Sequence, residues 1–375
     1  MTDIGFVRTD MVEARPAPVR TSGALAWMKK NLFATPLDSV LTVLGVAFLL
    51  WVVPPLYGFF LGNAVMPGGT VEQCRMENAG ACWAYIAAEM NFFIYGFYPA
   101  VEFWRPNLVF ALGALLLVPL LIPKVPFKRV NAVLLLLIYP VVSYILLAGG
   151  PFGLRVVPTE QWGGLLVTLI ISVVGIALSF PIGIVLALGR QSQLPIIKTA
   201  CVMFIELIRA VPLISILFMA SVMLPLFMPQ GMTIDKFLRA LVGVTLFTSA
   251  YLAEVVRGGL QAIPRGQYEA AAALGLGYWQ RMWFIILPQA LKYVIPGIVN
   301  NFISLFKDTS LVYIVGMRDL LEAVKTKNDS AIEWQSANTA TTGYIFAAMV
   351  FWVFCFGMSR YSIFMERRLN TGYKR

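Results

Sequence analysis

Long apolar runs constrain the fold of this chain more than any other feature of its sequence. A helix needs about 18 to 20 apolar residues to cross the hydrocarbon core of a bilayer, and eight runs approach or exceed that length. The sequence therefore predicts an all-α integral membrane protein with about eight transmembrane helices. The expected spans lie near residues 39–61, 106–122, 131–149, 163–188, 196–227, 237–256, 284–305 and 341–364.

The composition excludes a soluble protein and several kinds of functional site. Of the 375 residues, 59% are hydrophobic and 13% are charged, whereas soluble domains average about 25% charged residues. In a membrane protein, excess Lys and Arg such as the net charge of +10 usually serve to orient the spans. We therefore expect no nucleic-acid partner. The sequence has no histidine, which excludes Ser-His-Asp triads and histidine metal ligands, and we expect no metal site.

The distribution of Lys and Arg predicts which side of the membrane each segment faces. Basic residues collect in cytoplasmic segments. Here they collect before the first span, in every second connection and after the last span, so both termini are expected to be cytoplasmic. The resulting organisation is a cytoplasmic tail over 1–36, a three-span extension with a periplasmic loop over 37–155, and a five-span core over 156–375.

The predicted periplasmic loop contains two of the four cysteines. Cys74 and Cys82 have seven residues between them, a spacing too wide for a CxxC redox or zinc motif. In an oxidising compartment they are able to pair, so a disulfide is a hypothesis for this loop. The loop is also rich in aromatic residues. Cys201 and Cys355 lie in apolar runs and are most simply buried small residues.

The cytoplasmic segment between the sixth and seventh spans has a helical pattern. Pro264 suits the first turn of a helix, and Glu269 complements the dipole near the helix start. Gly275 and Gly277 are expected to end that helix or let the chain turn. A second short helix over 278–284 follows and runs into Leu287-Pro288. The segment is either an amphipathic connection on the membrane surface or a surface that another protein binds.

The spacing within this segment resembles a known motif. Glu269-Ala270-Ala271 is followed after three residues by Gly275, after nine more by Ile285, and then by Leu287-Pro288. This spacing matches the EAA motif of bacterial ABC importer permeases, EAA-x3-G-x9-I-x-LP, at every position. The resemblance implies a coupling helix at about 264–283 that docks into a groove of a separate ATPase. The residues implied in coupling are Glu269, Ala270, Ala271, Gly275, Gly277, Leu287 and Pro288.

Three further stretches resemble the polar amino-acid branch of these permeases. They are ELIRAVPLI (206–214), YLAEVVRGGLQAIPRGQ (251–267) and NNFISLFKDTSL (300–311). The resemblance covers about 160–375, and the three-span extension and chain length look like the M-type subunit of the general L-amino-acid permeases. It implies a permease subunit of an ATP-driven importer of L-amino acids, placed in the bacterial inner membrane, with a five-helix ABC permease core.

The resemblance also implies partners. A homologous Q-type permease would complete the translocation path as a heterodimer, a cytoplasmic ATPase dimer would supply energy, and a periplasmic binding protein would deliver the amino acid. The ATPase is expected to be a separate chain, because a Walker A loop needs Gly-Lys and that dipeptide does not occur in the sequence. ATP and Mg are therefore expected on that partner. This chain is expected to be no enzyme, to hold no cofactor of its own and to contact membrane lipid.

Polar side chains inside the predicted spans are candidates for the substrate path, because charges in hydrocarbon are costly and usually face the bundle interior. An amino acid is a zwitterion, so the path needs groups that replace water at its carboxylate and its ammonium. Glu206 and Arg209 stand at i, i+3 in the fifth span. They either line the path or its gate, or pair with each other. Glu254 and Arg257 repeat this spacing in the sixth span, as a gate or as an anchor at the cytoplasmic interface.

The seventh span contains a second polar group. Asn301 and Ser304 share a helical face, and Lys307 and Asp308 follow near the outer end, where a substrate would arrive. Lys307 and Asp308 are alternatively a snorkelling lysine and a helix cap.

Two other functions compete with an ATP-driven permease. A secondary amino-acid transporter driven by an ion gradient predicts inverted internal repeats and buried acidic residues, and we find no such repeat. A membrane scaffold without transport leaves the charges within the spans without a role.

Overall fold

A computed structural model describes residues 23–122, 124–229 and 234–369. Two compact units are present: the first is the described chain up to Ala64 with Asn78–Ala81, and the second is Val65–Glu77 with the described chain from Cys82. Most of the predicted cytoplasmic tail and the end of the chain lie outside the described residues. The basic residues outside them are Arg8, Arg15, Arg20, Lys374 and Arg375.

The first unit is built around one apolar helix. α1 (Ala24–Asn31) precedes α2 (Pro36–Tyr57), which continues into the π-helical η1 (Gly58–Gly62). The Thr35 hydroxyl accepts a hydrogen bond of 3.1 Å from the Asp38 N–H, and the Asp38 carboxylate accepts one of 3.1 Å from the Thr35 N–H. This capping box fixes the start of α2. α2 is apolar and buries no residue, as expected of a helix surrounded by lipid.

The described part of the second unit is almost entirely helical, with one two-residue strand. Its helices are α3 (Val71–Arg75), α4 (Trp83–Tyr95), α5 (Trp104–Leu121), α6 (Lys128–Val133), α7 (Tyr139–Ala148), α8 (Gly164–Arg190), α9 (Pro195–Ala210), α10 (Leu213–Phe218), α11 (Lys236–Gln261), α12 (Arg265–Ala273), α13 (Tyr278–Arg281), α14 (Leu287–Tyr293), α15 (Ile295–Asp308), α16 (Leu320–Ser330) and α17 (Ala337–Leu369). Shorter segments are η2 (Ala100–Glu102), η3 (Leu134–Ile138), η4 (Pro151–Gly153), η5 (Thr159–Gln161), η6 (Met219–Met223), η7 (Leu224–Phe227), η8 (Met282–Ile286), η9 (Thr309–Val315), η10 (Ile332–Trp334) and the strand β1 (Arg318–Asp319).

The spans confirm the predicted membrane fold. Among the described residues, six helices are long and apolar enough to cross a membrane, and two further helix pairs are bent within one span. The bent pairs are the fifth and seventh expected spans. α9 meets the helix that starts with α10 at 103°, beside Pro212, and the α13–α14 helix meets α15 at 67°, beside Pro296. Proline explains both positions, because it has no N–H to continue the helical ladder.

α8 and α11 pack against each other through small residues at the centre of the core. A Cβ added to Gly183 of α8 would lie 2.8 Å from the Leu252 Cβ and 3.1 Å from the Ser249 carbonyl oxygen, both on α11. Real Cβ atoms do not approach so closely, so glycine allows this separation of the two helices. The charged ends of the two helices are brought together as a result.

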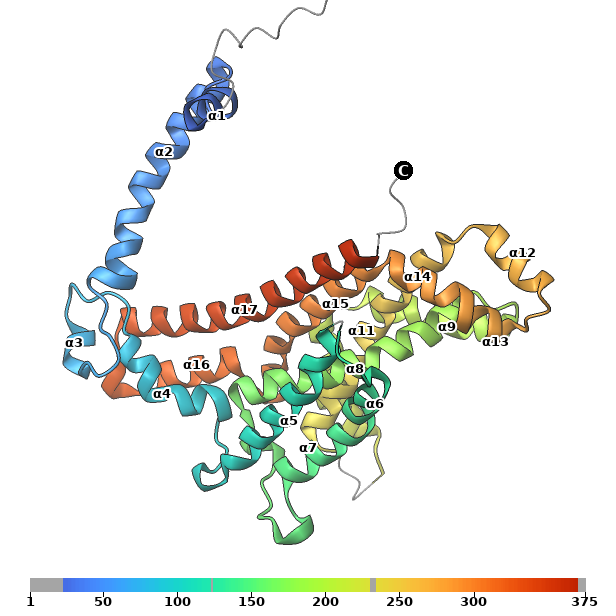
Figure 1. Ribbon diagram of the computed structural model, residues 1–375. Helices are drawn as coiled ribbons and strands as arrows, with labels where there is room; N and C mark the ends of the chain where they lie inside the picture. The colour runs from blue at the N-terminus through green and yellow to red at the C-terminus, as the bar shows by residue number, and fades with distance from the viewer. Residues whose placement is uncertain (1–22, 123, 230–233, 370–375) are drawn as a thin grey trace, which may run out of the picture. The chain divides into compact units, whose positions relative to one another are not determined.

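The segment between the first two spans is not the loop that the sequence predicts. α4 forms there, with Tyr85 and Phe93 fully buried, and it packs against α8, α16 and α17. Figure 1 shows α4 and α16 together at one end of the second unit, while α12 projects at the opposite end. Much of the predicted extension is therefore packed into the same unit as the core.

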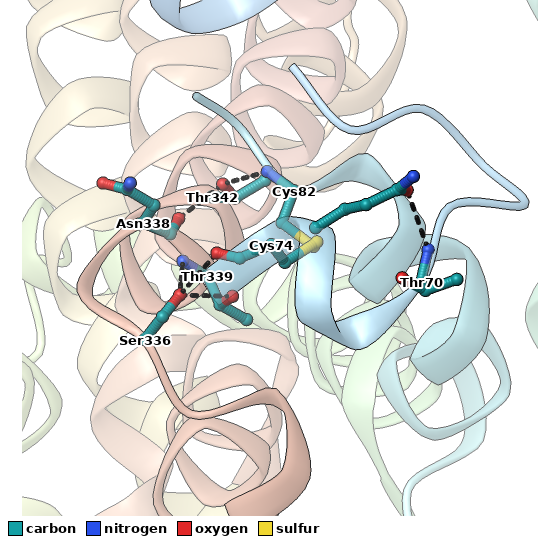
Figure 2. The surroundings of a disulfide bond; sticks show 8 residues. Thr70, Cys74, Cys82, Ser336, Asn338, Thr339 and Thr342 are labelled. Atoms are coloured by element: carbon teal, nitrogen blue, oxygen red, sulfur yellow. Dashed lines mark hydrogen bonds between the residues drawn. A yellow bond between two sulfur atoms is a disulfide. The ribbon is translucent and has the colours of Figure 1, made fainter. Parts of the chain in front are cut away.

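A disulfide lies beside α4, in the position that the sequence suggested. Cys74 is bonded to Cys82, and both are buried (Figure 2). The Cys82 N–H donates a hydrogen bond of 3.0 Å to Thr342 Oγ1, and Ser336 Oγ donates one of 3.3 Å to the Cys74 carbonyl. Ser336 directly precedes α17 and Thr342 lies in its first turns, so the disulfide loop is attached to the core.

Candidate functional site

The predicted coupling segment begins with α12, and a turn at Gly275 ends this helix. The Gly275 N–H donates to the Ala272 carbonyl at 2.9 Å, and the Leu276 N–H donates to the Ala271 carbonyl at 3.4 Å. Gly275 has a φ of 72°, the left-handed conformation that glycine adopts without strain. This double closure is a Schellman motif, and it places the turn where the sequence predicts it.

The three residues that open the motif face different surroundings. Glu269 and Ala270 are exposed, whereas Ala271 is buried against the rest of the chain. Leu274, which directly follows the last residue of α12, is 75% exposed. The exposed face of α12 therefore combines a carboxylate, a small side chain and one large apolar side chain.

The second half of the segment is helical from Tyr278 onward. The Gln280 side chain accepts a hydrogen bond of 3.0 Å from the Gly277 N–H at the start of α13. The helix then runs without a break through η8 into α14, so it continues into Leu287 and Pro288 as the sequence predicts. η8 is π-helical and directly precedes Leu287 and Pro288. Pro288 cannot donate an N–H to the preceding turn, which explains the local widening.

The coupling segment is packed tightly onto the end of α11. A Cβ on Gly259 of α11 would lie 2.6 Å from the Ala290 carbonyl oxygen of α14. The Tyr268 hydroxyl of α12 donates a hydrogen bond of 3.2 Å to the Leu260 carbonyl of α11. Buried apolar residues fill the space between these helices. They include Val256, Leu260, Ile263, Met282, Ile286, Leu287 and Ala290.

Charged residues from α8, α9 and α11 form one ionic cluster, which consists of Arg190, Glu206, Arg209, Glu254 and Arg257. The Arg190 guanidinium lies 2.8 Å from Glu206 Oε1 and 3.0 Å from Glu254 Oε1. Arg209 lies 3.6 Å from Glu254 Oε2, and Arg257 lies 2.8 Å from the same atom. Glu254 therefore contacts three guanidinium groups.

The structure contradicts one alternative that the sequence left open, the pairing of Glu206 with Arg209. Glu206 and Arg209 do not pair with each other: Glu206 pairs with Arg190, and Arg209 pairs with Glu254. Because α8 and α11 pack tightly, charged side chains of neighbouring helices come within reach of one another. The pairs between helices form in place of a Glu206–Arg209 pair within α9. Glu254 and Arg257 do pair within α11, as their i, i+3 spacing suggests. The Arg209 guanidinium also lies 5.4 Å from the centre of the Tyr251 ring.

The cluster also contains Arg190, a residue that the sequence did not predict for the site. It is the last residue of α8, where a basic side chain is expected on topological grounds alone. Its partners Glu206 and Glu254 lie on two other helices, so no local spacing points to it. The one available signal was an arginine directly adjoining an apolar run.

The polar residues of the seventh span lie on an amphipathic helix. Ile298, Leu305 and Phe306 of α15 are buried, and Ser304 and Lys307 on its other side are exposed, with Asn301 and Asp308 half-buried. Asn301 donates a hydrogen bond of 2.8 Å to the Gly297 carbonyl of its own helix. In the described residues neither Lys307 nor Asp308 forms an ion pair with the ionic cluster. The two predicted polar groups therefore remain separate within this chain.

The described residues contain no group of three Cys, Asp or Glu side chains placed to share a metal ion. The side chains of the ionic cluster offer ion pairing and hydrogen bonding. Its guanidinium groups suit a carboxylate, and its exposed carboxylate suits an ammonium.

Comparison with known proteins identifies the family of the chain. Residues 179–371 match the family of binding-protein-dependent transport system inner membrane components. The chain belongs to this family. It is 50% identical to the inner membrane amino-acid ABC transporter permease protein YhdY of Escherichia coli K12, over 96% of both chains. It is 41% identical to the glutamate/glutamine/aspartate/asparagine transport system permease protein BztC of Rhodobacter capsulatus, over the whole of both chains.

A solved structure shares part of this likeness. The match to one chain of the crystal structure of an amino acid ABC transporter with histidines has 30% identity and a TM-score of 0.48, over 55% of this chain and 92% of the other. The family assignment makes the protein a multi-pass permease component of the inner membrane. The family and the extent of the likeness to an ABC transporter permease decide against the transporter driven by an ion gradient.

Proposed function

We propose that this permease component forms half of the path of an ATP-driven importer of L-amino acids. The observation that carries the proposal is the identity of 50% along 96% of both chains with a permease named for amino-acid transport. The second relative, 41% identical along both whole chains, is named for glutamate, glutamine, aspartate and asparagine. We therefore place polar amino acids first among the substrates to be tested.

The geometry of the ionic cluster supports a zwitterionic substrate. Glu206 is 55% exposed and Arg209 is 35% exposed, so both have charged surface left for a ligand. Arg209 suits the substrate carboxylate and Glu206 suits its ammonium, because each is a charge-assisted hydrogen-bonding partner of the opposite sign. The broken span that carries them leaves backbone groups near Pro212 free of the helical ladder, as transport sites often require.

The exposed polar side of α15 supports a second permease subunit. Ser304 and Lys307 are exposed in this chain although they belong to a span, and lipid is a poor environment for such groups. A homologous subunit facing α15 would enclose these side chains in a shared aqueous path. In this proposal Asn301 and Asp308 line the same path.

The coupling segment supports a separate ATPase. Glu269, Ala270 and Leu274 form an exposed surface at the end of the unit opposite α4 and α16 (Figure 1). An ATPase groove would cover the apolar Leu274 and accept the close approach of Ala270. ATP and Mg bind to that partner in this proposal, and the cytoplasmic termini predicted by the charge pattern put α12 on the same side of the membrane.

Reconstitution tests this function. The chain is purified with a homologous permease, an ATPase and a binding protein from the same organism and placed in proteoliposomes. Uptake of labelled glutamate and glutamine should require both ATP inside the vesicles and the binding protein outside. Uptake that follows a proton or sodium gradient without ATP would contradict the proposal.

A further inference from the structure

Glu254 has an arrangement of partners that differs from every other member of the ionic cluster. Its carboxylate contacts Arg190 from α8, Arg209 from α9 and Arg257 from α11, at 3.0, 3.6 and 2.8 Å. A carboxylate offers about four acceptor positions, so three guanidinium groups occupy most of its capacity. One side chain thus holds three helices together.

Burial separates Glu254 from the residues assigned to the substrate. The Glu254 side chain is 15% exposed, whereas that of Glu206 is 55% exposed. A substrate ammonium can reach Glu206 from outside the cluster, but it would have to displace arginines to reach Glu254. Glu254 is therefore placed to position other groups.

The chain connects Glu254 directly to the coupling segment. α11 continues for about two turns beyond Glu254 before it ends at Gln261, and α12 begins at Arg265. The contact of Gly259 with the α14 backbone and the bond from Tyr268 to the Leu260 carbonyl join the end of α11 to both halves of that segment. A displacement of α12 is therefore transmitted to the end of α11 that carries Glu254.

On its other side, Glu254 contacts the helix that carries the proposed substrate groups. Arg209 binds Glu254 directly, and Glu206 is connected to it through Arg190. α9 meets the next helix at 103°, beside Pro212, so its end is a break in the helical ladder at which the angle can change. These contacts give α9 a mechanical connection to α11 that bypasses the loops.

We propose that Glu254 and Arg190 are positioning residues that transmit movement of the coupling segment to Glu206 and Arg209. The proposal rests on the proposed function, because it assumes that an ATPase moves α12 and that α9 contacts the substrate. When the end of α11 moves, Glu254 carries Arg209 with it, and Arg190 shifts Glu206. Both substrate-facing charges then change position in the same step.

The test uses the complete transporter in proteoliposomes and the variant Glu254→Gln. Glutamine has nearly the same shape but no charge, so the arginines of three helices lose their shared partner. ATP hydrolysis should continue within about twofold of wild type, while substrate uptake per ATP should fall about tenfold, within the usual range of coupling between sites. The KM for uptake should stay unchanged, since Glu254 does not contact the substrate.

A matched control is available at the other end of the unit. Glu89 is also 15% exposed and pairs with Lys327 at 2.7 Å, so Glu89→Gln removes an equally buried, paired carboxylate. Its uptake per ATP should equal that of wild type. Glu254→Asp, which keeps the charge on a shorter side chain, should recover part of the lost coupling. Arg190→Gln should lower coupling, and adding it to Glu254→Gln should lower coupling no further.

The outcomes separate this inference from the proposed function. If wild type shows no ATP-dependent amino-acid uptake, the proposed function has failed. If wild type is active and Glu254→Gln keeps its uptake per ATP, or matches Glu89→Gln in every respect, the positioning role is wrong. A raised KM with unchanged coupling would also overturn it, because Glu254 would then be a substrate contact. Should Glu254→Gln fail to assemble, Glu254→Asp with Arg190→Gln provides the same comparison.

Discussion

The Tyr85 hydroxyl donates a hydrogen bond of 2.9 Å to Asn328 Oδ1, across 243 residues of sequence. The bond joins α4 of the predicted extension to α16 of the core. The Tyr85 ring is fully buried and packs at 5.7 Å from the Phe93 ring and 5.8 Å from the Trp334 ring. This part of the extension thus stabilises a core helix through packing as well as polar bonds.

Substitutions at Tyr85 should show both contributions. Tyr85→Phe removes the hydroxyl and its bond to Asn328 and should lower the free energy of unfolding by about 1 kcal/mol. Tyr85→Ala also removes the buried ring and should cost about 3–5 kcal/mol. Thermal unfolding of the purified chain in detergent measures both. Tyr144 is largely exposed, so Tyr144→Ala is the control, and equal effects at the two positions would refute the packing argument.

The disulfide should stabilise the same region. Replacing Cys74 and Cys82 by serine should lower the free energy of unfolding by about 2 kcal/mol, as expected for the closure of a short loop. Reductant should lower the thermal midpoint of wild type and leave that of the double variant unchanged. Cys201 is free in the structure, so Cys201→Ser should respond to reductant as wild type does. A wild-type midpoint that ignores reductant would contradict the stabilising role.

The apolar runs predict the spans well because burial in lipid depends on local composition. Both bent spans carry prolines that the sequence shows directly, at Pro212 and Pro296. The apolar runs do not predict α4, because it is 13 residues long and therefore too short to cross a bilayer. Its burial comes from contacts with α16 and α17, which lie far along the chain.

The candidate site was only partly predictable for a similar reason. Gly275 could be placed because a helix end has a local signature in the order of its residues. The partner of Glu206 could not be predicted, because Arg190 lies on another helix. The i, i+3 spacing within α9 suggested Arg209 instead. Ion pairs between helices depend on how closely those helices pack, which single-sequence spacing does not encode.

Substitutions at Gly275 should separate backbone strain from docking. Gly275 has a φ of 72°, and no atom lies within 4 Å of an added Cβ. Any side chain should therefore cost about 1–2 kcal/mol of turn stability, with asparagine costing less. Gly275→Trp should fit within this chain yet block a protein surface pressed against α12. Uptake per ATP should fall more for Gly275→Trp than for Gly275→Ala.

Gly316 provides a strain-matched control for that comparison. Its φ is 83°, and it also has no atom within 4 Å of an added Cβ, but it follows η9, away from the coupling segment. Gly316→Trp should produce a similar loss of thermal stability and no loss of uptake per ATP. Equal coupling in Gly275→Trp and Gly316→Trp would mean that no partner docks at this turn.

Asp319 should make the stability of the chain depend on pH. Its carboxylate is fully buried and caps α16 by accepting hydrogen bonds of 3.1 Å from the N–H groups of Leu321 and Glu322. Burial raises the pKa of Asp319 to about 6, against the lowering effect of those two bonds. The folded chain therefore holds this proton more tightly than the unfolded chain does. The stabilisation is full below the unfolded pKa of about 4 and is lost as pH rises through about 6.

Asp319→Asn should remove this dependence, because asparagine keeps a capping oxygen and cannot ionise. The thermal midpoint of wild type should fall between pH 4 and pH 7 relative to that of the variant. Glu160, an exposed carboxylate 3.7 Å from Lys236, supplies the control. Glu160→Gln should retain the wild-type slope in that range, since its carboxylate stays in solvent. A slope that persists in Asp319→Asn would assign the titration to another group.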